Sequence, residues 1–179
     1  PYQSLDDKGL LINVNKKWCD VTGYSKDEAI GQKFSIFTDE SYERLKALFK
    51  IFLENKKVEN EKIKIKKKNG EIILASFTGN FSNINGELKT HCIFKDITAQ
   101  EKIEKKLKLS DIVFENTNEG MLITNNKNNI ISINSAFTKI TGYEEADIIN
   151  KNPKVLKSGK HDKEFYEKLW SDLLTTGQF

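Results

Sequence analysis

Cysteine is scarce in this chain, which has only Cys19 and Cys92 among 179 residues and no CxxC pair. Structural zinc sites and disulfide scaffolds need several cysteines at short, regular spacing. We therefore expect neither a metal site nor a disulfide. The two thiols are expected to be small buried side chains in a protein of a reducing, cytoplasmic compartment.

Long apolar runs are also missing, since no stretch of 18 or more apolar residues occurs and no signal peptide is recognisable. The chain itself is thus expected to be soluble, without direct membrane contact. It begins at Pro1 rather than Met and stops at Phe179. We expect it to be a piece of a longer protein.

An excess of one charge sign is absent: 29 Lys and Arg against 26 Asp and Glu give a net charge of +3. Nucleic-acid binding needs clustered positive charge, so no nucleic-acid partner is expected. One lysine cluster alternates with Ile63 and Ile65, which indicates the solvent face of a strand whose isoleucines point inward. Its members are Lys62, Lys64, Lys66, Lys67 and Lys68.

Catalytic signatures are missing too. The sequence contains no nucleophile elbow, no phosphate-binding P-loop, no HExxH pair and no carboxylate dyad at a familiar spacing. These absences remove the common hydrolase, nucleotidase and metalloprotease classes. The expected role is that of a sensor and not of an enzyme.

An internal repeat is present: identical residues recur at a spacing of 119 positions, as Lys8 and Lys127 do. Seven identities carry it: Lys8, Ile12, Asn15, Thr22, Gly23, Tyr24 and Ile30 match Lys127, Ile131, Asn134, Thr141, Gly142, Tyr143 and Ile149. A duplicated domain explains this order. The second copy stops where the first would begin its last strands, so we expect it to be incomplete.

The first copy alternates between strand and helix patterns. Residues 2–15 indicate a hairpin, Gly23 ends a short helix, and Ser25 with Glu28 forms a capping box for another. Thr38 is expected to start a longer helix, over 41–55, whose apolar stripe is Leu45, Leu48, Phe49 and Phe52. Three strands follow, at 58–67, 71–81 and 88–96, joined by the turn pairs Asn69-Gly70 and Asn85-Gly86.

The joint between the two copies is the segment from Asp96 to Thr98. Thr98 and Glu101 have capping-box spacing, which predicts a helix through Phe114. Ile103, Leu107, Ser110 and Phe114 follow the 4-3-4 spacing of a parallel coiled-coil seam. A stripe that packs on its own domain would have the same spacing, so both readings stay open.

Both copies resemble PAS domains. The resemblance rests on Asn15 through Thr22-Gly23-Tyr24, on Lys68-Asn69-Gly70-Glu71, on the exit Asp96-Ile97-Thr98, and on 134–143 and 152–162 in the second copy. It implies an α+β PAS fold, with a five-stranded antiparallel sheet carrying helices on one face. The implied order is a first PAS domain at 1–98, a signalling linker helix at 99–114 and a second, C-terminally truncated PAS domain at 115–179. It also implies a ligand pocket between sheet and helices, and a relay that starts at Asp96 and Thr98. The helix residues Ile103, Leu107 and Phe114, taken from the 4-3-4 spacing, complete the expected relay.

Strand parity makes the inner wall of the first sheet apolar. The candidate pocket residues are Trp18, Phe49, Ile65, Ala75, Phe77, Thr90, Cys92 and Phe94. The cysteine motif of photoadduct-forming flavin domains is absent, the long helix has no haem-binding histidine, and His91 has outward parity. The first domain is left with no cofactor or a small apolar ligand. In the second, His161 could be an iron ligand or an exposed loop residue, and FAD is an alternative with Trp170 as stacking partner or core residue.

Three functions remain at this point. The leading one is a sensory region of a bacterial signalling protein that detects a ligand or partner and acts, as a homodimer, on an output domain of the same chain. That output is expected to be a histidine kinase of a two-component system or a cyclic-di-GMP enzyme with GGDEF/EAL domains. The alternatives are a ligand-free dimerisation or docking module, and an FAD redox sensor through the second domain.

Overall fold

The computed structural model of the chain describes residues 1–84 and 87–177. It consists of two compact units, Pro1–Lys105 and Lys106–Phe179, each with its own sheet and core. The predicted turn at Asn85-Gly86 lies outside the described residues. Across the part of the chain that is described, no helix has the length and apolar character needed to cross a membrane.

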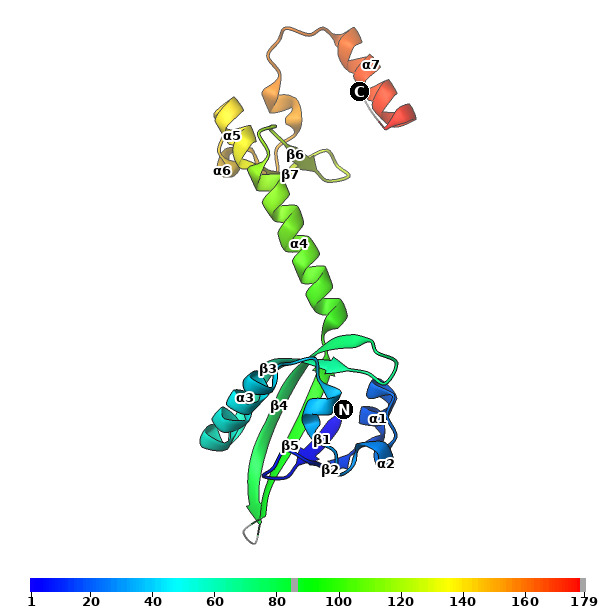
Figure 1. Ribbon diagram of the computed structural model, residues 1–179. Helices are drawn as coiled ribbons and strands as arrows, with labels where there is room; N and C mark the ends of the chain where they lie inside the picture. Colours follow the sequence, from blue (N-terminus) through cyan, green and yellow to red (C-terminus); the bar gives the residue numbers. More distant parts are fainter. Residues whose placement is uncertain (85–86, 178–179) are drawn as a thin grey trace. The chain divides into compact units, whose positions relative to one another are not determined.

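The first unit contains a five-stranded antiparallel sheet in the order β2-β1-β5-β4-β3 (Figure 1). Its strands are β1 Tyr2–Leu5, β2 Leu11–Val14, β3 Lys57–Lys66, β4 Ile72–Ile84 and β5 Glu87–Asp96. The predicted N-terminal hairpin and the three later strands are confirmed. Gly70 closes the turn between β3 and β4 with φ +86°, a backbone conformation that glycine adopts without steric cost.

The inner face of this sheet is apolar because alternate residues of each strand point to the same side. Its buried members are Ile63 and Ile65 on β3, Ile73, Ala75 and Phe77 on β4, and Thr90, Cys92 and Phe94 on β5. The lysines that alternate with the β3 isoleucines are exposed. The predicted strand parity is therefore confirmed.

Four helices cover the inner face: α1 Lys16–Thr22, α2 Lys26–Ala29, the 3-10 helix η1 Phe34–Phe37 and α3 Tyr42–Asn55. Asn15 caps α1 by accepting a hydrogen bond from the Trp18 N–H at 2.9 Å, and Gly23 ends it in the left-handed region. The capping box of Ser25 and Glu28 at α2 is confirmed. Local side-chain chemistry thus sets the ends of these short helices.

The predicted helix over 41–55 is confirmed as α3, but the residue that starts it differs from the prediction. Ser41, not Thr38, is its N-cap. Thr38 instead forms a β-bridge with Ile65, and the Asp39 N–H donates to the Lys64 carbonyl at 3.0 Å. These bonds to β3 keep residues 38–39 extended, so the helix begins after the next residue able to cap it. The predicted apolar stripe of α3 packs onto the core, with Phe52 buried.

The second unit repeats the first half of this arrangement. Its elements are β6 Leu122–Thr124, β7 Ile130–Ile133, α5 Ser135–Thr141, α6 Glu145–Ile148, η2 Pro153–Leu156 and α7 Lys163–Thr176. Asn134 caps α5 as Asn15 caps α1, and Gly142 ends α5 as Gly23 ends α1. β6 and β7 form a two-stranded antiparallel sheet among the described residues. That this copy is C-terminally truncated stays a prediction.

Between the two sheets the chain forms the helix α4, Thr98–Asn116. The predicted helix over 99–114 is confirmed and continues two residues further. None of its described side chains is buried. The division between the two compact units falls inside it, at Lys105.

Candidate functional site

A cavity of about 220 Å³ lies in the first unit, between the inner face of the sheet and the helices η1 and α3. Its wall is mostly apolar, with four phenylalanine rings. The lining residues are Gln3, Leu5, Lys8, Gly9, Lys33, Phe34, Ser35, Tyr42, Leu45, Lys46, Leu48, Phe49, Phe52, Val58, Glu61, Ile63, Phe77 and Cys92. Such a wall suits a small ligand with an apolar body.

Three of the predicted pocket residues line this cavity: Phe49, Phe77 and Cys92. The other five, Trp18, Ile65, Ala75, Thr90 and Phe94, are buried in the core without lining it. Parity sends the strand residues to the inner face, but part of that face is covered by packed rings, such as Trp18 against Phe37 at 5.4 Å between centroids. Contact of a ligand with any of these residues stays a prediction.

Polar residues at the cavity were not found from the sequence. Four of these polar residues are exposed and come from separate parts of the chain, yet they line the cavity: Lys8, Lys33, Tyr42 and Lys46. Gln3 is only 1% exposed, and its Oε1 accepts a hydrogen bond from Trp18 Nε1 at 2.9 Å. A polar residue at the inward position of a strand was the one signal available for Gln3, and nothing local marked the lysines.

Cys92 lies in the cavity wall with its thiol buried. Burial raises the pKa of its thiol to about 11. The thiol is therefore neutral at pH 7 and contributes to the cavity as a small apolar group. Neither Cys92 nor Cys19 forms a disulfide.

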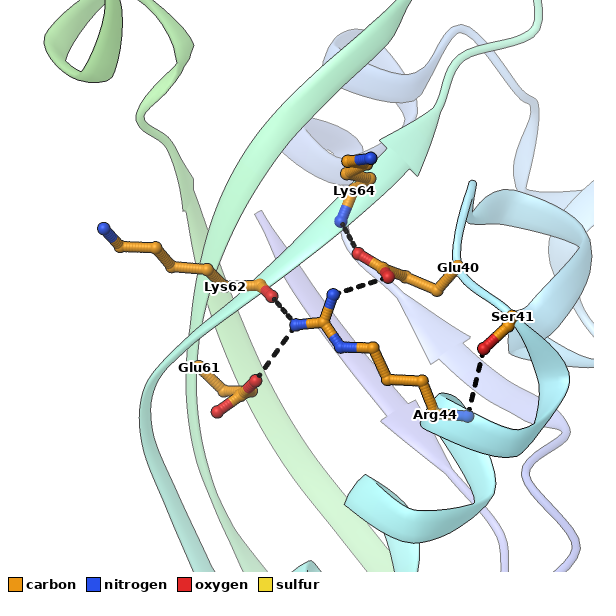
Figure 2. Close-up of polar contacts among 6 residues, drawn as sticks. All are labelled: Glu40, Ser41, Arg44, Glu61, Lys62 and Lys64. Atoms are coloured by element: carbon orange, nitrogen blue, oxygen red, sulfur yellow. Dashed lines mark hydrogen bonds and ion pairs between the residues drawn. The ribbon is translucent and has the colours of Figure 1, made fainter. Parts of the chain in front are cut away.

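Arg44 fastens α3, which lines the cavity, to the neighbouring strand β3 (Figure 2). Its guanidinium donates to the Glu40 carboxylate at 2.6 Å and to the Lys62 carbonyl at 2.9 Å, and pairs with Glu61 at 3.5 Å. The other Glu40 oxygen accepts from the Lys64 N–H at 2.9 Å. Because the Glu40 side chain is only 6% exposed, this pair is partly shielded from solvent and fixes the first turn of α3 on β3.

The joint between β5 and α4 is held by contacts with two other strands, a backbone N–H of β4 and a lysine side chain of β3. Thr98 Oγ1 accepts a hydrogen bond from the Leu74 N–H of β4 at 2.9 Å. The Glu101 carboxylate forms an ion pair with Lys62 of β3, and its hydrogen bond raises the pKa of the Lys62 ammonium. Asp96 Oδ1 accepts from the Thr98 N–H at 2.9 Å, as expected for a carboxylate at this turn.

The predicted capping box of Thr98 and Glu101 is therefore wrong. Both side chains bond to the sheet instead of to the first turn of the helix. The reason is the packing of the strands: β4 brings the Leu74 N–H to Thr98, and β3 brings Lys62 within reach of Glu101. The result is a helix whose first turn is attached to the strands that form the cavity wall.

The predicted seam on α4 is largely exposed. Ile103 is 61% and Leu107 65% exposed, whereas Phe114 is half-buried. The alternative that this stripe packs on its own domain does not hold for Ile103 and Leu107. The same helix also exposes Leu109, Ile112 and Val113.

The candidate residues of the second unit are also exposed. The His161 ring stacks on Phe165 with 4.1 Å between centroids, and Trp170 is 46% exposed. No group of three or more His, Cys, Asp or Glu side chains suited to a metal ion occurs within residues 1–84 and 87–177. An FAD site at Trp170 stays a prediction.

Two family models match this chain, and together they cover most of it. A PAS domain model matches residues 3–99, and a PAS fold model matches residues 111–179. Nitrogen fixation regulatory proteins of Klebsiella oxytoca and Klebsiella pneumoniae are 37% and 35% identical to it over 60 residues. Those residues are 34% of this chain and 12% of each relative, so the match spans about an eighth of the relatives' length.

Solved structures resemble it at low identity. A PAS domain of an HTR-like protein from Haloarcula marismortui has a TM-score of 0.49 and 21% identity, covering 54% of this chain and 79% of that one. A PAS domain from Colwellia psychrerythraea has a TM-score of 0.47 and 23% identity, covering 55% and 86%.

Proposed function

The chain belongs to the PAS domain family, with one PAS match in each half, and from this premise we propose that it is a non-catalytic sensory region of a bacterial signalling protein. The first unit detects a small ligand or a partner. The change passes through α4 to an output module outside this sequence, a histidine kinase or a GGDEF/EAL protein. Two unpaired thiols support a cytoplasmic location.

The attachment of α4 to the cavity wall is the observation that carries this proposal. β5 contributes Cys92 to the cavity and continues through Asp96 into the helix. The hydrogen bond between Leu74 and Thr98 links β4 to the same helix turn. A ligand that shifts these strands therefore changes the free energy of the first turn of α4, which is what a coupling between two sites requires.

We expect Thr98→Val to weaken this coupling. Valine keeps the shape of threonine but cannot accept the hydrogen bond of the Leu74 N–H, at a cost of about 1 kcal/mol. The response of the output activity to the stimulus in the full-length protein should fall about fivefold, the factor that corresponds to this free energy. Autophosphorylation or cyclic-di-GMP turnover, with and without the stimulus, measures it.

Thr78→Val is the matched control. Thr78 also lies on the sheet, and its Oγ1 accepts a hydrogen bond from the Asn60 N–H at 3.2 Å, but this bond does not involve α4. It should leave the response within about twofold of wild type. Equal responses of the two variants would count against a relay through the β5–α4 joint.

Dimerisation through α4 is the second part of the proposal, and it also serves the alternative of a ligand-free docking module. The exposed side chains Ile103 and Leu107 lie on the 4-3-4 stripe, where a second copy of the helix would cover them. Burial of one leucine is worth about 1.5–3 kcal/mol, and a dimer buries the same seam leucine in each of its two chains.

We expect Leu107→Glu to weaken the dimer about 100-fold or more, because two charges would enter the seam and two buried leucines would be lost. Leu109→Glu is the matched control, since Leu109 is similarly exposed, at 61%, but lies off the stripe. Size-exclusion chromatography with light scattering over a concentration series measures the dissociation constant. A wild-type monomer at high micromolar concentration, or equal effects of the two variants, would contradict the parallel seam.

A further inference from the structure

We infer that the cavity of the first unit binds a small amphipathic anion, such as a medium-chain carboxylate. The apolar body lies against the phenylalanine wall, and the negative charge lies toward three lysines of the lining, Lys8, Lys33 and Lys46, called here the lysine mouth. This inference rests on the proposed sensory function and names the chemistry of its ligand.

The size and wall of the cavity define the body of the ligand. Its volume of about 220 Å³ is below the range of about 300–1,000 Å³ typical of sites for drug-sized molecules. Phe34, Phe49, Phe52 and Phe77 supply the rings of the wall. A short alkyl chain or one ring fits this description, and its burial provides the favourable apolar term.

The lysine mouth is assembled from three separate parts of the fold. Lys8 lies in the turn between β1 and β2, Lys33 precedes η1, and Lys46 lies on α3. The Phe34 N–H donates to the Gly9 carbonyl at 3.0 Å, which joins the first two segments. Three lysines that are distant in sequence thus line the same cavity.

These three lysines are not engaged in ion pairs with any residue in the described part of the chain. The carboxylate in the cavity lining, Glu61, already pairs with Arg44. An anionic group on a ligand would therefore meet attraction from the lysines, and a cationic group would meet repulsion.

Gln3 offers one hydrogen-bond donor to an occupant of the cavity. An indole N–H can only donate, so the Gln3 amide oxygen faces Trp18 and the amide nitrogen points away from it. That nitrogen forms no hydrogen bond with a described residue, although Gln3 is only 1% exposed and lines the cavity. No buried side-chain nitrogen or oxygen of the described residues lacks a partner, so this nitrogen keeps access to the cavity, where water or an acceptor on a ligand can pair it.

Calorimetric titration of the purified chain with octanoate and decanoate tests the inference, with 1-decanol as the neutral comparison. We expect one molecule of acid per chain and binding of decanol at least about tenfold weaker than that of decanoate. In the variant with Lys8→Gln, Lys33→Gln and Lys46→Gln, decanoate should bind about 30-fold more weakly, since each exposed ion pair contributes modestly.

The matched control replaces three exposed lysines of β3 and β5 that do not line the cavity: Lys64→Gln, Lys66→Gln and Lys95→Gln. It removes the same total charge and should leave decanoate binding within about twofold. The inference is overturned if neither acid binds, if decanol binds as tightly as decanoate, or if both triple variants behave alike. Calorimetry measures ligand binding alone, whereas the Thr98→Val experiment measures the relay to the output. Either result can be negative while the other is positive, so the two proposals are tested separately.

Discussion

Gly79→Ala is expected to destabilise the first unit by about 3 kcal/mol, at the upper end of the usual cost of overpacking. Gly79 lies on β4 directly opposite Cys92 of β5. A Cβ atom there would lie 2.5 Å from Cys92 Sγ, 2.6 Å from the His91 carbonyl oxygen and 2.9 Å from Cys92 Cα. Two of these atoms belong to the backbone, so the two strands would have to separate.

Urea unfolding followed by tryptophan fluorescence measures this loss. A Trp170→Phe background leaves buried Trp18 as the single tryptophan, so the signal reports on the first unit. Gly70→Ala is the control, because its positive φ makes alanine cost about 1 kcal/mol while no atom lies within 4 Å of the added Cβ. Cys92→Ala should relieve part of the Gly79→Ala cost, since it removes the sulfur but not the backbone atoms. Similar costs for the two glycine variants would refute the steric explanation.

Asn134→Ala is expected to destabilise the second unit by about 3 kcal/mol. Asn134 is 1% exposed, and its side chain makes four hydrogen bonds with backbone groups. Oδ1 accepts from the N–H groups of Met121 and Phe137, and Nδ2 donates to the carbonyls of Phe114 and Glu119. Each bond contributes about 1 kcal/mol net, or about 4 kcal/mol for the four. We expect a somewhat smaller loss because the backbone around the missing side chain relaxes.

The repeat supplies the matched variant, Asn15→Ala. Asn15 Oδ1 accepts from the corresponding N–H groups of Tyr2 and Trp18, but Asn15 is exposed and its amide nitrogen holds no helix end among the described residues. Its loss should cost about 1 kcal/mol, the usual value for an N-cap. Hydrogen exchange, followed by mass spectrometry, compares the two sites through the four backbone N–H groups that donate to the asparagines. These are the amides of Tyr2, Trp18, Met121 and Phe137. Equal losses of protection would show that the two bonds donated by Asn134 Nδ2, to Phe114 at the end of α4 and to Glu119 beyond it, contribute nothing.

Much of the fold follows from patterns within short windows of sequence. The caps at Asn15, Ser25 and Gly23 bond to residues at most four positions away, so their partners are known from the sequence itself. Strand parity likewise depends only on alternation, which is why the inward residues from Ile63 to Phe94 were predicted correctly.

The errors occur where a residue had a choice of partners. Thr98 can bond to the first turn of its own helix or to a strand, and β4 supplies the Leu74 N–H. Thr38 can cap a helix or remain extended, and its bridge to Ile65 decides for the second. In both cases the competing partner is distant in sequence and appears only when the sheet is formed.

By itself, the sequence determined the duplication, the order of the elements, the faces of the strands and the presence of a helix after Thr98. The tertiary structure decided which apolar residues line a cavity, that Lys8, Lys33 and Lys46 also line it, and that Lys62 and Leu74 attach α4 to the sheet. The reason is the range of the interactions. Periodicity and capping act within a turn or a strand, whereas a cavity and its charges arise from packing between segments that only the folded chain brings together.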